Sequence, residues 1–296
     1  MPKYGEMYFP FLSSSESDLR VSFEFFPPKT EKMEETLWHS VEQLSPLNPE
    51  FVSVTYGAGG TTRERTHDIV TKIHNDKDLN VAAHLTCVGA SRGEIDDIAR
   101  RYWDEGIKHI VALRGDLPEG YGHHSDGYKY ANELVEGLKK IADFEISVAG
   151  YPEKHPEAET MEQDLENLKR KVDCGADRVM SQFFVDPENF LRFRDMAQEI
   201  GINVPIVPGI LPITNFSSTV KFSKMCGTNM PAWMSELFEG LDGHPHTREL
   251  VAVNLVSEQC RVLYENGVKD FHFYTLNRAE LSLAICHVLG IRAKTA

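Results

Sequence analysis

Short segments rich in β-branched and aromatic residues recur along the whole 296-residue chain, and this repetition constrains the fold more than any other feature. Helical patterns separate the segments: Met33, Leu37, Val41 and Leu44, for example, fall on one face of a helix. Strands that alternate with helices pair in parallel, because each crossover returns the chain to the same edge. We therefore predict eight strands, over residues 21–26, 51–56, 81–87, 109–113, 145–149, 178–185, 204–210 and 270–276.

The arrangement of these units favours a closed (β/α)8 barrel, because no change of composition divides the chain into two open sheets. The alternative, a doubly wound sheet, usually carries a glycine-rich phosphate turn after its first strand. Here Pro27 and Pro28 follow the first strand, and Thr62 stands where the Gly57 cluster would need the last glycine of a dinucleotide motif. The prediction is an α/β fold with one TIM barrel over residues 1–296, in which residues 1–20 form a short N-terminal extension.

The interval 211–269 is about twice as long as the other connections, and we expect two helices in it, one of them additional to the barrel. The polar stretch 239–246 contains glycine and proline and predicts an exposed excursion.

Three helix starts are predicted from local signals. Ser91 and Thr160 have Glu or Gln three residues later, as in a capping box, and Asp186 precedes a proline.

Charge excludes several classes of partner. The chain has 31 basic and 45 acidic residues, a net charge of −14, and a surface this acidic repels nucleic acids and anionic membranes. Any anionic ligand must therefore be bound by a local group of basic residues.

The five cysteines are scattered without a C-x-x-C pair, which fits a reducing compartment rather than a disulfide framework or a zinc site. The first twenty residues lack the apolar stretch of a secretory signal, and no run approaches the ~20 apolar residues that span a bilayer. We expect a soluble cytoplasmic protein that binds no metal, no nucleic acid and no membrane, and that assembles with copies of itself.

Chemistry in such a barrel is carried by the residues at the carboxyl ends of the strands. Glu24 alternates inward between two phenylalanines, and such surroundings predict a raised carboxyl pKa that suits a general acid. A salt-bridged or outward-facing glutamate is the alternative. The other polar strand-end residues are Thr55, Tyr56, His84, Thr86, Arg114, Asp116, Tyr151, His155, Gln182, Thr275 and Arg278.

Two further groups have both a functional and an ordinary interpretation. Arg114 and Asp116 flank a glycine and could bind a polar ring, or they could simply form an ion pair that caps a turn. Asp164, Asn167, Arg170 and Lys171 recur on one predicted helix and could clamp a diphosphate, although such a run is often a solvated face.

Several longer stretches stand out in order along the chain: residues 21–28 (VSFEFFPP), 53–60 (SVTYGAGG), 84–87 (HLTC), 113–116 (LRGD), 151–156 (YPEKHP) and 271–279 (FHFYTLNRA). They closely resemble stretches of bacterial-type methylenetetrahydrofolate reductases, and the likeness extends over essentially the whole chain. The family consists of FAD-dependent (β/α)8 enzymes, so the resemblance implies the same barrel.

The resemblance also implies roles for individual residues. Arg170 and Lys171 would serve the diphosphate of FAD. The positions that match FAD-contacting residues of the family are Tyr56, Ala58, His84, Arg114, Gly115, Asp116, Ala131, Tyr151, His155, Ala158, Asp164, Asn167, Arg170 and Lys171. The positions that match substrate-binding residues are Thr55 on the nicotinamide side, Gln182 for NADH and folate, Asp116 and Arg278 for folate, and Phe222 as a stacking ring.

The implied reaction is ping-pong: NADH, which we favour over NADPH, reduces the flavin, and 5,10-methylenetetrahydrofolate then becomes 5-methyltetrahydrofolate, a methyl source for methionine synthesis. Glu24 would be the general acid, and Asp116 would tune the flavin. Ser218 stands where relatives carry an amide that reaches folate, so we do not assign it to the site. Two other functions are considered, a flavin-free barrel lyase or aldolase and a catalytically silent folate- or nucleotide-binding barrel.

Overall fold

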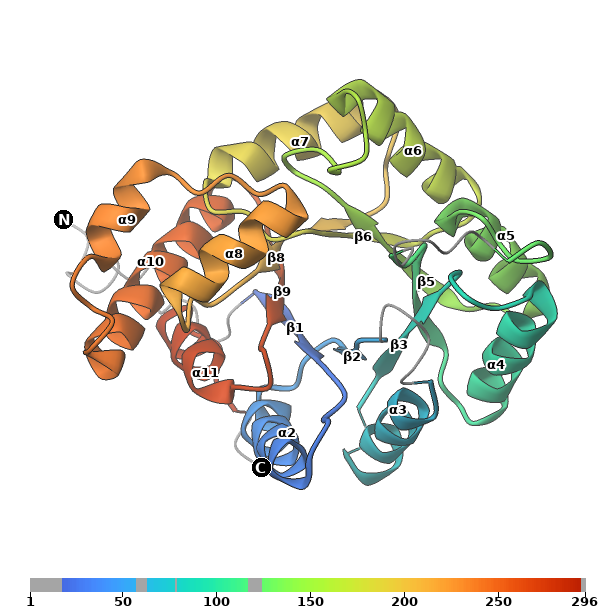
Figure 1. The fold of residues 1–296 in the computed structure, drawn as a ribbon, viewed down its shortest axis with the longest axis horizontal. Helices are drawn as coiled ribbons and strands as arrows, with labels where there is room; N and C mark the ends of the chain where they lie inside the picture. Colours follow the sequence, from blue (N-terminus) through green and yellow to red (C-terminus); the bar gives the residue numbers. More distant parts are fainter. Residues whose placement is uncertain (1–17, 57–62, 78, 117–123, 294–296) are drawn as a thin grey trace.

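The computed structural model describes residues 18–56, 63–77, 79–116 and 124–293, and its parallel strands form a ring surrounded by helices (Figure 1). The strands are β1 (Arg20–Phe25), β2 (Val52–Val54), β3 (Val81–Thr86), β4 (His109–Leu113), β5 (Glu145–Gly150), β6 (Arg178–Ser181), β7 (Ile206–Val207), β8 (Gly209–Ile210) and β9 (Asp270–Tyr274). Their order in the sheet is β7-β6-β5-β4-β3-β2-β1-β9-β8. The predicted α/β barrel is confirmed.

The seventh predicted strand, over residues 204–210, is divided into β7 and β8 at Pro208. Proline has no N–H to donate, so the ladder breaks there. β7 pairs with β6 and β8 pairs with β9, while the Pro208 carbonyl accepts a hydrogen bond of 3.0 Å from the His272 N–H. These two short strands together close the ring between β6 and β9.

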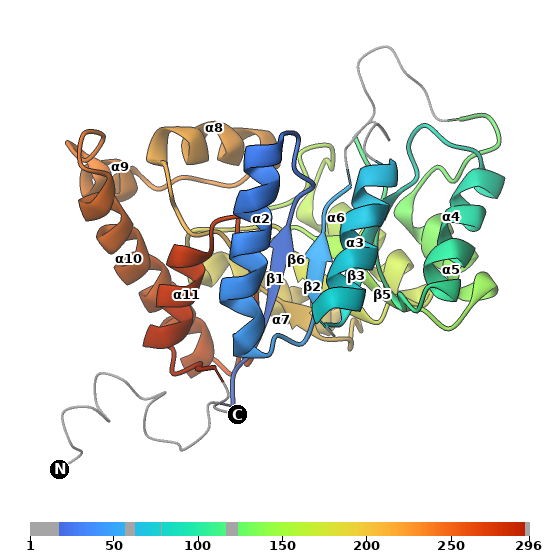
Figure 2. The ribbon, with the colours of Figure 1, turned by 90° about the horizontal axis from the view of Figure 1, so that it is seen from below.

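The helices that follow the strands are α2 (Glu31–Leu44), α3 (Arg63–Lys77), α4 (Arg92–Asp104), α5 (Ala131–Ile141), α6 (Met161–Asp173), α7 (Pro187–Glu199), α8 (Phe216–Cys226), α9 (Ala232–Phe238), α10 (Pro245–Glu265) and α11 (Ala279–Val288), with a 3-10 turn, η2 (Ser45–Leu47). No described helix combines the length and the apolar character that crossing a bilayer requires. Figure 2 shows α8 at the same end of the barrel as the start of α2.

The interval 211–269 holds three helices rather than the two predicted, because α9 is a separate seven-residue helix. Met234 and Phe238 of α9 are buried in a small apolar cluster together with Ile213 and Ala252. The predicted excursion after α9 is exposed, but it is shorter than expected because α10 already begins at Pro245.

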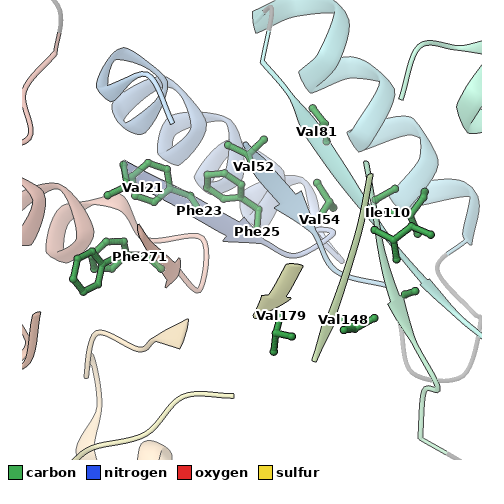
Figure 3. Close-up of a cluster of buried hydrophobic side chains, with 14 of the residues drawn as sticks. Val21, Phe23, Phe25, Val52, Val54, Val81, Ile110, Val148, Val179 and Phe271 are labelled. Carbon is green, nitrogen blue, oxygen red and sulfur yellow. The ribbon is translucent and has the colours of Figure 1, made fainter. Parts of the chain in front are cut away.

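The main apolar core lies between the sheet and the helices. Val21, Phe23 and Phe25 of β1 are buried there beside neighbouring strands (Figure 3). The predicted face of α2 packs against this core through Leu37, Val41 and Leu44. Because side chains alternate along a strand, Ser22 and Glu24 point to the opposite face of β1, into the barrel.

Two of the three predicted helix starts have the expected geometry. Ser91 and Glu94 form a complete capping box at α4, and Asp186 caps α7 with Pro187 at its first position. Thr160 caps α6 by accepting a hydrogen bond from Gln163 N–H, but the Gln163 amide oxygen accepts from the Glu159 N–H instead of closing the box.

Candidate active site

The interior of the barrel is unusually polar near the carboxyl ends of its strands. Glu24 of β1 lies between two imidazoles: its Oε2 is 3.3 Å from Nε2 of His84 on β3 and 3.6 Å from Nε2 of His272 on β9. His272 is fully buried, and its Nδ1 shares a hydrogen bond of 2.7 Å with the Ser22 hydroxyl. Four residues from three strands thus form one connected polar row across the barrel.

The raised pKa predicted for Glu24 is wrong for the ligand-free protein. Burial of the carboxyl does raise its pKa, but contacts with His272 and His84 outweigh burial and lower the pKa to about 2. The prediction failed because Phe23 and Phe25 point to the helix side of the sheet, so the apolar neighbours in sequence are not the neighbours of the carboxyl. The inward orientation of Glu24 itself is as predicted.

A second network joins the end of β4 to the connection between β5 and α6. Arg114 donates two hydrogen bonds to the carboxylate of Glu157, at 2.5 and 2.8 Å. Glu157 N–H donates to His155 Nδ1 at 3.1 Å, and His155 N–H donates to Asp164 at 2.9 Å. The Tyr151 ring meets His155 edge-on at 4.6 Å. The structure therefore brings four predicted residues, Arg114, Tyr151, His155 and Asp164, into one network.

The two cations of α6 lie in different environments. Lys171 donates to the Ala149 carbonyl oxygen at 2.6 Å, and burial lowers its pKa to about 8 although Asp164 acts in the opposite direction. Arg170 is exposed and donates to Asn167 at 2.7 Å. Lys171 thus faces the end of β5, whereas Arg170 and Asn167 interact with each other at the surface.

The predicted substrate positions surround the same end of the barrel. Gln182 follows β6, and its N–H donates to the Gly150 carbonyl at 2.7 Å. Phe222 on α8 stacks on Phe183 with ring centroids 5.4 Å apart and remains 42% exposed, which leaves one face open to a ligand. Thr55 follows β2 and Arg278 precedes α11, both at strand ends.

The remaining predicted residues are placed as follows. Gly115 has φ +83°, and a Cβ there would lie 3.0 Å from Thr86, so only glycine fits comfortably between β4 and β3. Asp116 is exposed, Tyr56 and Ala158 are buried, and Ala131 begins α5. Ala58 lies outside the described residues.

The residues present fit an anionic cofactor with polar edges. Arg114 and Lys171 supply positive charge next to the strand ends. The Thr86 hydroxyl is buried without a hydrogen-bond partner in the described part of the chain, so a bound polar group can satisfy it. Within the same described ranges, no group of three or more His, Cys, Asp and Glu side chains is arranged to hold a metal ion.

Sequence reasoning missed three residues of these networks. Ser22 lies two positions before Glu24 and His272 lies three positions before Thr275, so both precede the predicted strand-end residues, and Glu157 lies in a proline-containing loop that offered no signal. The period-two alternation of β9, in which Phe271 and Phe273 are apolar and His272 lies between them, could have identified the inward histidine.

Parallel β/α barrels with a buried carboxylate and histidines at the carboxyl ends of the strands are typically enzymes, and the geometry places this chain in that class. The family model for methylenetetrahydrofolate reductase matches residues 12–290. The chain therefore belongs to the methylenetetrahydrofolate reductase family, and it is an oxidoreductase of folate one-carbon metabolism.

Individual relatives agree with this assignment. The chain is 54% identical over 281 residues to the 5,10-methylenetetrahydrofolate reductase of Escherichia coli (strain K12), with 95% of this chain and 94% of the relative covered. It is 36% identical to a probable methylenetetrahydrofolate reductase (NADH) of Oryza sativa subsp. japonica, covering 91% of this chain and 48% of that protein.

Among solved structures, a Clostridium thermocellum protein described as binding two copies of 5-methyl-5,6,7,8-tetrahydrofolic acid has a similar fold. Its TM-score is 0.58 at 16% identity, and the match covers 92% of this chain and 93% of the other. At that level of identity the likeness supports the barrel fold alone.

Proposed function

We propose that this enzyme uses FAD and NADH to reduce 5,10-methylenetetrahydrofolate to 5-methyltetrahydrofolate. The observation that carries the proposal is the buried Glu24 carboxylate between His84 and His272, at the end of the barrel where the polar positions of this family gather. The name of the rice relative, which includes NADH, favours that nucleotide over NADPH.

FAD would be held by the loops after β4 and β5 and by α6. Lys171 and Arg114 would attract the diphosphate or another electron-rich edge, and Glu157 would have to share Arg114 with it. When bound, the flavin supplies a carrier that accepts a hydride from one substrate and returns it to the other. Asp116, exposed beside Gly115, would tune the polar edge of the ring.

NADH and folate would occupy one place in turn, which gives a ping-pong reaction. Phe222 offers an exposed aromatic face for stacking either substrate. Gln182 would donate to or accept from both ligands, Thr55 would contact the nicotinamide, and Arg278 would attract the carboxylates of folate.

Glu24 would act as the general acid that opens the five-membered ring of the folate. Its pKa of about 2 means that the ligand-free protein holds an ionised carboxylate paired with histidine. Substrate that covers the pocket would remove water from around the carboxylate, which disfavours its charged form and raises its pKa. Glu24 would then take a proton from solvent and donate it to one nitrogen of the five-membered ring, the bond between that nitrogen and the methylene carbon would break, and the carbon would remain as an iminium ready to receive hydride.

The product would supply methyl groups for methionine synthesis. The five cysteines are all free, which agrees with a location in the reducing cytoplasm. We also keep the expectation that the chain forms a homo-oligomer.

Half-reaction spectroscopy tests the proposal. The purified protein should show flavin absorption, NADH should bleach it, and methylenetetrahydrofolate should restore it. A colourless protein that binds no added FAD would instead favour the lyase or aldolase function. Binding of flavin and folate without either half-reaction would favour a silent binding barrel.

A further inference from the structure

The turn between β9 and α11 contains a feature that the proposed reaction has not used. Leu276 and Asn277 have φ values of +52° and +54°, and they are the only two consecutive non-glycine residues with positive φ in the described ranges. L-residues avoid this region because Cβ approaches the backbone, so the conformation costs free energy unless the surroundings impose it.

The side chain of Asn277 imposes it. The residue is 3% exposed, and its amide bonds both main-chain polar groups of Phe26, just beyond β1. Oδ1 accepts from the Phe26 N–H at 3.0 Å, and Nδ2 donates to the Phe26 carbonyl oxygen at 2.8 Å. The amide therefore does for Phe26 what a neighbouring strand would do, and extends the pairing of β1 with β9 past the end of the ladder.

The main chain of the same turn is bonded to the candidate acid. Thr275 donates to the Glu24 carbonyl oxygen through its N–H at 3.2 Å and through its hydroxyl at 2.6 Å. Asn277 N–H donates back to the Thr275 hydroxyl at 3.1 Å, and Ser40 donates to the Asn277 carbonyl oxygen at 2.7 Å. The turn and the end of β1 are thus one hydrogen-bonded unit.

The two neighbours of Asn277 in the chain are the exposed members of this unit. Leu276 is 42% exposed, and Arg278 is also exposed, whereas Thr275 and Asn277 are buried. We call the two hydrogen bonds between the Asn277 amide and Phe26 the amide clamp. Because buried Thr275 and Asn277 alternate with Leu276 and Arg278, the amide clamp fixes where the two exposed residues leave the turn. The hydrogen bonds from Thr275 hold the main chain of Glu24 to the same turn.

We propose that Asn277 is a positioning residue for folate reduction, which aligns the acid Glu24 with Arg278 and with the exposed Leu276 beside it. The inference rests on the proposed function of Glu24 and Arg278. Proton transfer needs hydrogen-bond distance and direction, so a shift of the turn against β1 slows the reaction without removing any reacting group. A residue needed only for its backbone conformation would be better as glycine, which adopts positive φ without strain.

That difference defines the test. Asn277→Gly keeps the backbone conformation and removes the amide clamp. Asn277→Asp keeps the size and the acceptor for Phe26 N–H, but it sets a carboxylate oxygen against the Phe26 carbonyl. Asn48 provides the matched control, because it also has positive φ, at +53°, but is exposed before β2 at the opposite end of the barrel. Asn48→Gly therefore changes the same residue type without touching the site.

Both half-reactions are measured for the FAD-loaded wild type and the three variants, together with thermal unfolding. For both Asn277 variants, the folate half-reaction should slow about tenfold or more and its KM should rise. Reduction of flavin by NADH should stay within about twofold of wild type, because that step needs no proton from Glu24. Asn48→Gly should match wild type in both half-reactions.

Two results would overturn the inference. If Asn277→Gly, or Asn277→Asp should the glycine variant not fold, loses thermal stability but keeps wild-type folate kinetics, the clamp serves stability alone. If wild type itself reduces flavin with NADH but does not reduce folate, the proposed function fails and the inference fails with it. The first result leaves the proposed function intact, so the two failures are distinguishable.

Discussion

At the scale of single residues, Glu24 shows how a local pattern can identify a residue and still misjudge its chemistry. Alternation along β1 correctly predicted that Glu24 points into the barrel, because that property depends on the strand alone. Its pKa depends on His84 and His272, which lie 60 and 248 positions away in the sequence. A single sequence shows no such contacts, so the direction of the pKa shift of Glu24 could not be predicted from it.

Replacement of Glu24 tests its assigned role. Glu24→Gln should retain FAD and the NADH half-reaction, because neither requires the acid, and should slow the folate half-reaction by about 10²–10⁴-fold, the usual contribution of a general acid. Rapid-mixing absorbance of the flavin measures both steps on one sample. Ser91→Ala, which removes only the cap of α4, serves as a control for a general loss of stability. Folate reduction at the parental rate in Glu24→Gln would remove Glu24 from this role.

The buried ammonium of Lys171 gives a pH-dependent prediction. Its pKa of about 8 in the ligand-free protein means that the positive charge is present below pH 8 and is lost as pH rises through that value. An anionic cofactor binds the charged form better, so the Kd for FAD should rise between pH 7 and pH 9. Fluorescence titration of flavin at several pH values measures this change.

Lys171→Met should bind FAD more weakly at pH 7 and should lose most of the pH dependence. Lys169→Met provides the control, because Lys169 lies on the same helix but pairs with Asp173. A wild-type Kd that is constant from pH 7 to pH 9 would show that Lys171 does not attract the cofactor electrostatically.

At the scale of elements, predictions succeeded where the signal is local. The caps at Ser91 and Asp186 were predictable because each involves a residue and backbone groups within one turn. The separate helix α9 was not predicted, because it depends on packing against distant elements. The division of the seventh strand was also missed, although its cause, Pro208, is visible in the sequence. The sequence predicted that polar residues gather at the strand ends. It did not predict that Arg114, after β4, pairs with Glu157 in the connection between β5 and α6.

Replacement of Gly209 in β8 tests how closely β8 packs against Ser181 and Tyr274 where the barrel closes. A Cβ at this position would overlap the Ser181 carbonyl oxygen and lie 2.7 Å from the Tyr274 hydroxyl, which itself donates to Ser181. Gly209→Ala should therefore cost on the order of 3 kcal/mol of unfolding free energy, as overpacking typically does. Urea unfolding followed by circular dichroism gives the value. Gly243→Ala, where a Cβ meets open space, should cost nothing, and equal stability of the two variants would contradict the closure described.

At the scale of the whole molecule, the number and alternation of strands were sufficient to predict the barrel, because a closed ring of parallel units is a global consequence of a repeated local pattern. The net charge of −14 gave only exclusions. The fold adds a location: Arg114 follows β4 and Lys171 donates to the Ala149 carbonyl of β5, so both cations lie at the carboxyl ends of neighbouring strands. The extent of the domain, including residues 1–20 as an extension, stays a prediction.

This local positive charge leads to a prediction about the entire fold. FAD that binds only the folded state stabilises it by mass action, by about 2.7 kcal/mol at a free concentration one hundred times Kd. For a chain of this size the midpoint of thermal unfolding should rise by roughly 5 °C. FMN, which lacks the adenylate half and the diphosphate, should give a smaller shift at the same concentration, and so should FAD with Lys171→Met. Because the attraction between Lys171 and the phosphates is electrostatic, the shift that FAD produces should shrink as salt is raised. An unfolding midpoint that does not respond to FAD at any concentration would contradict both the cofactor and its assigned place at the carboxyl ends of the strands.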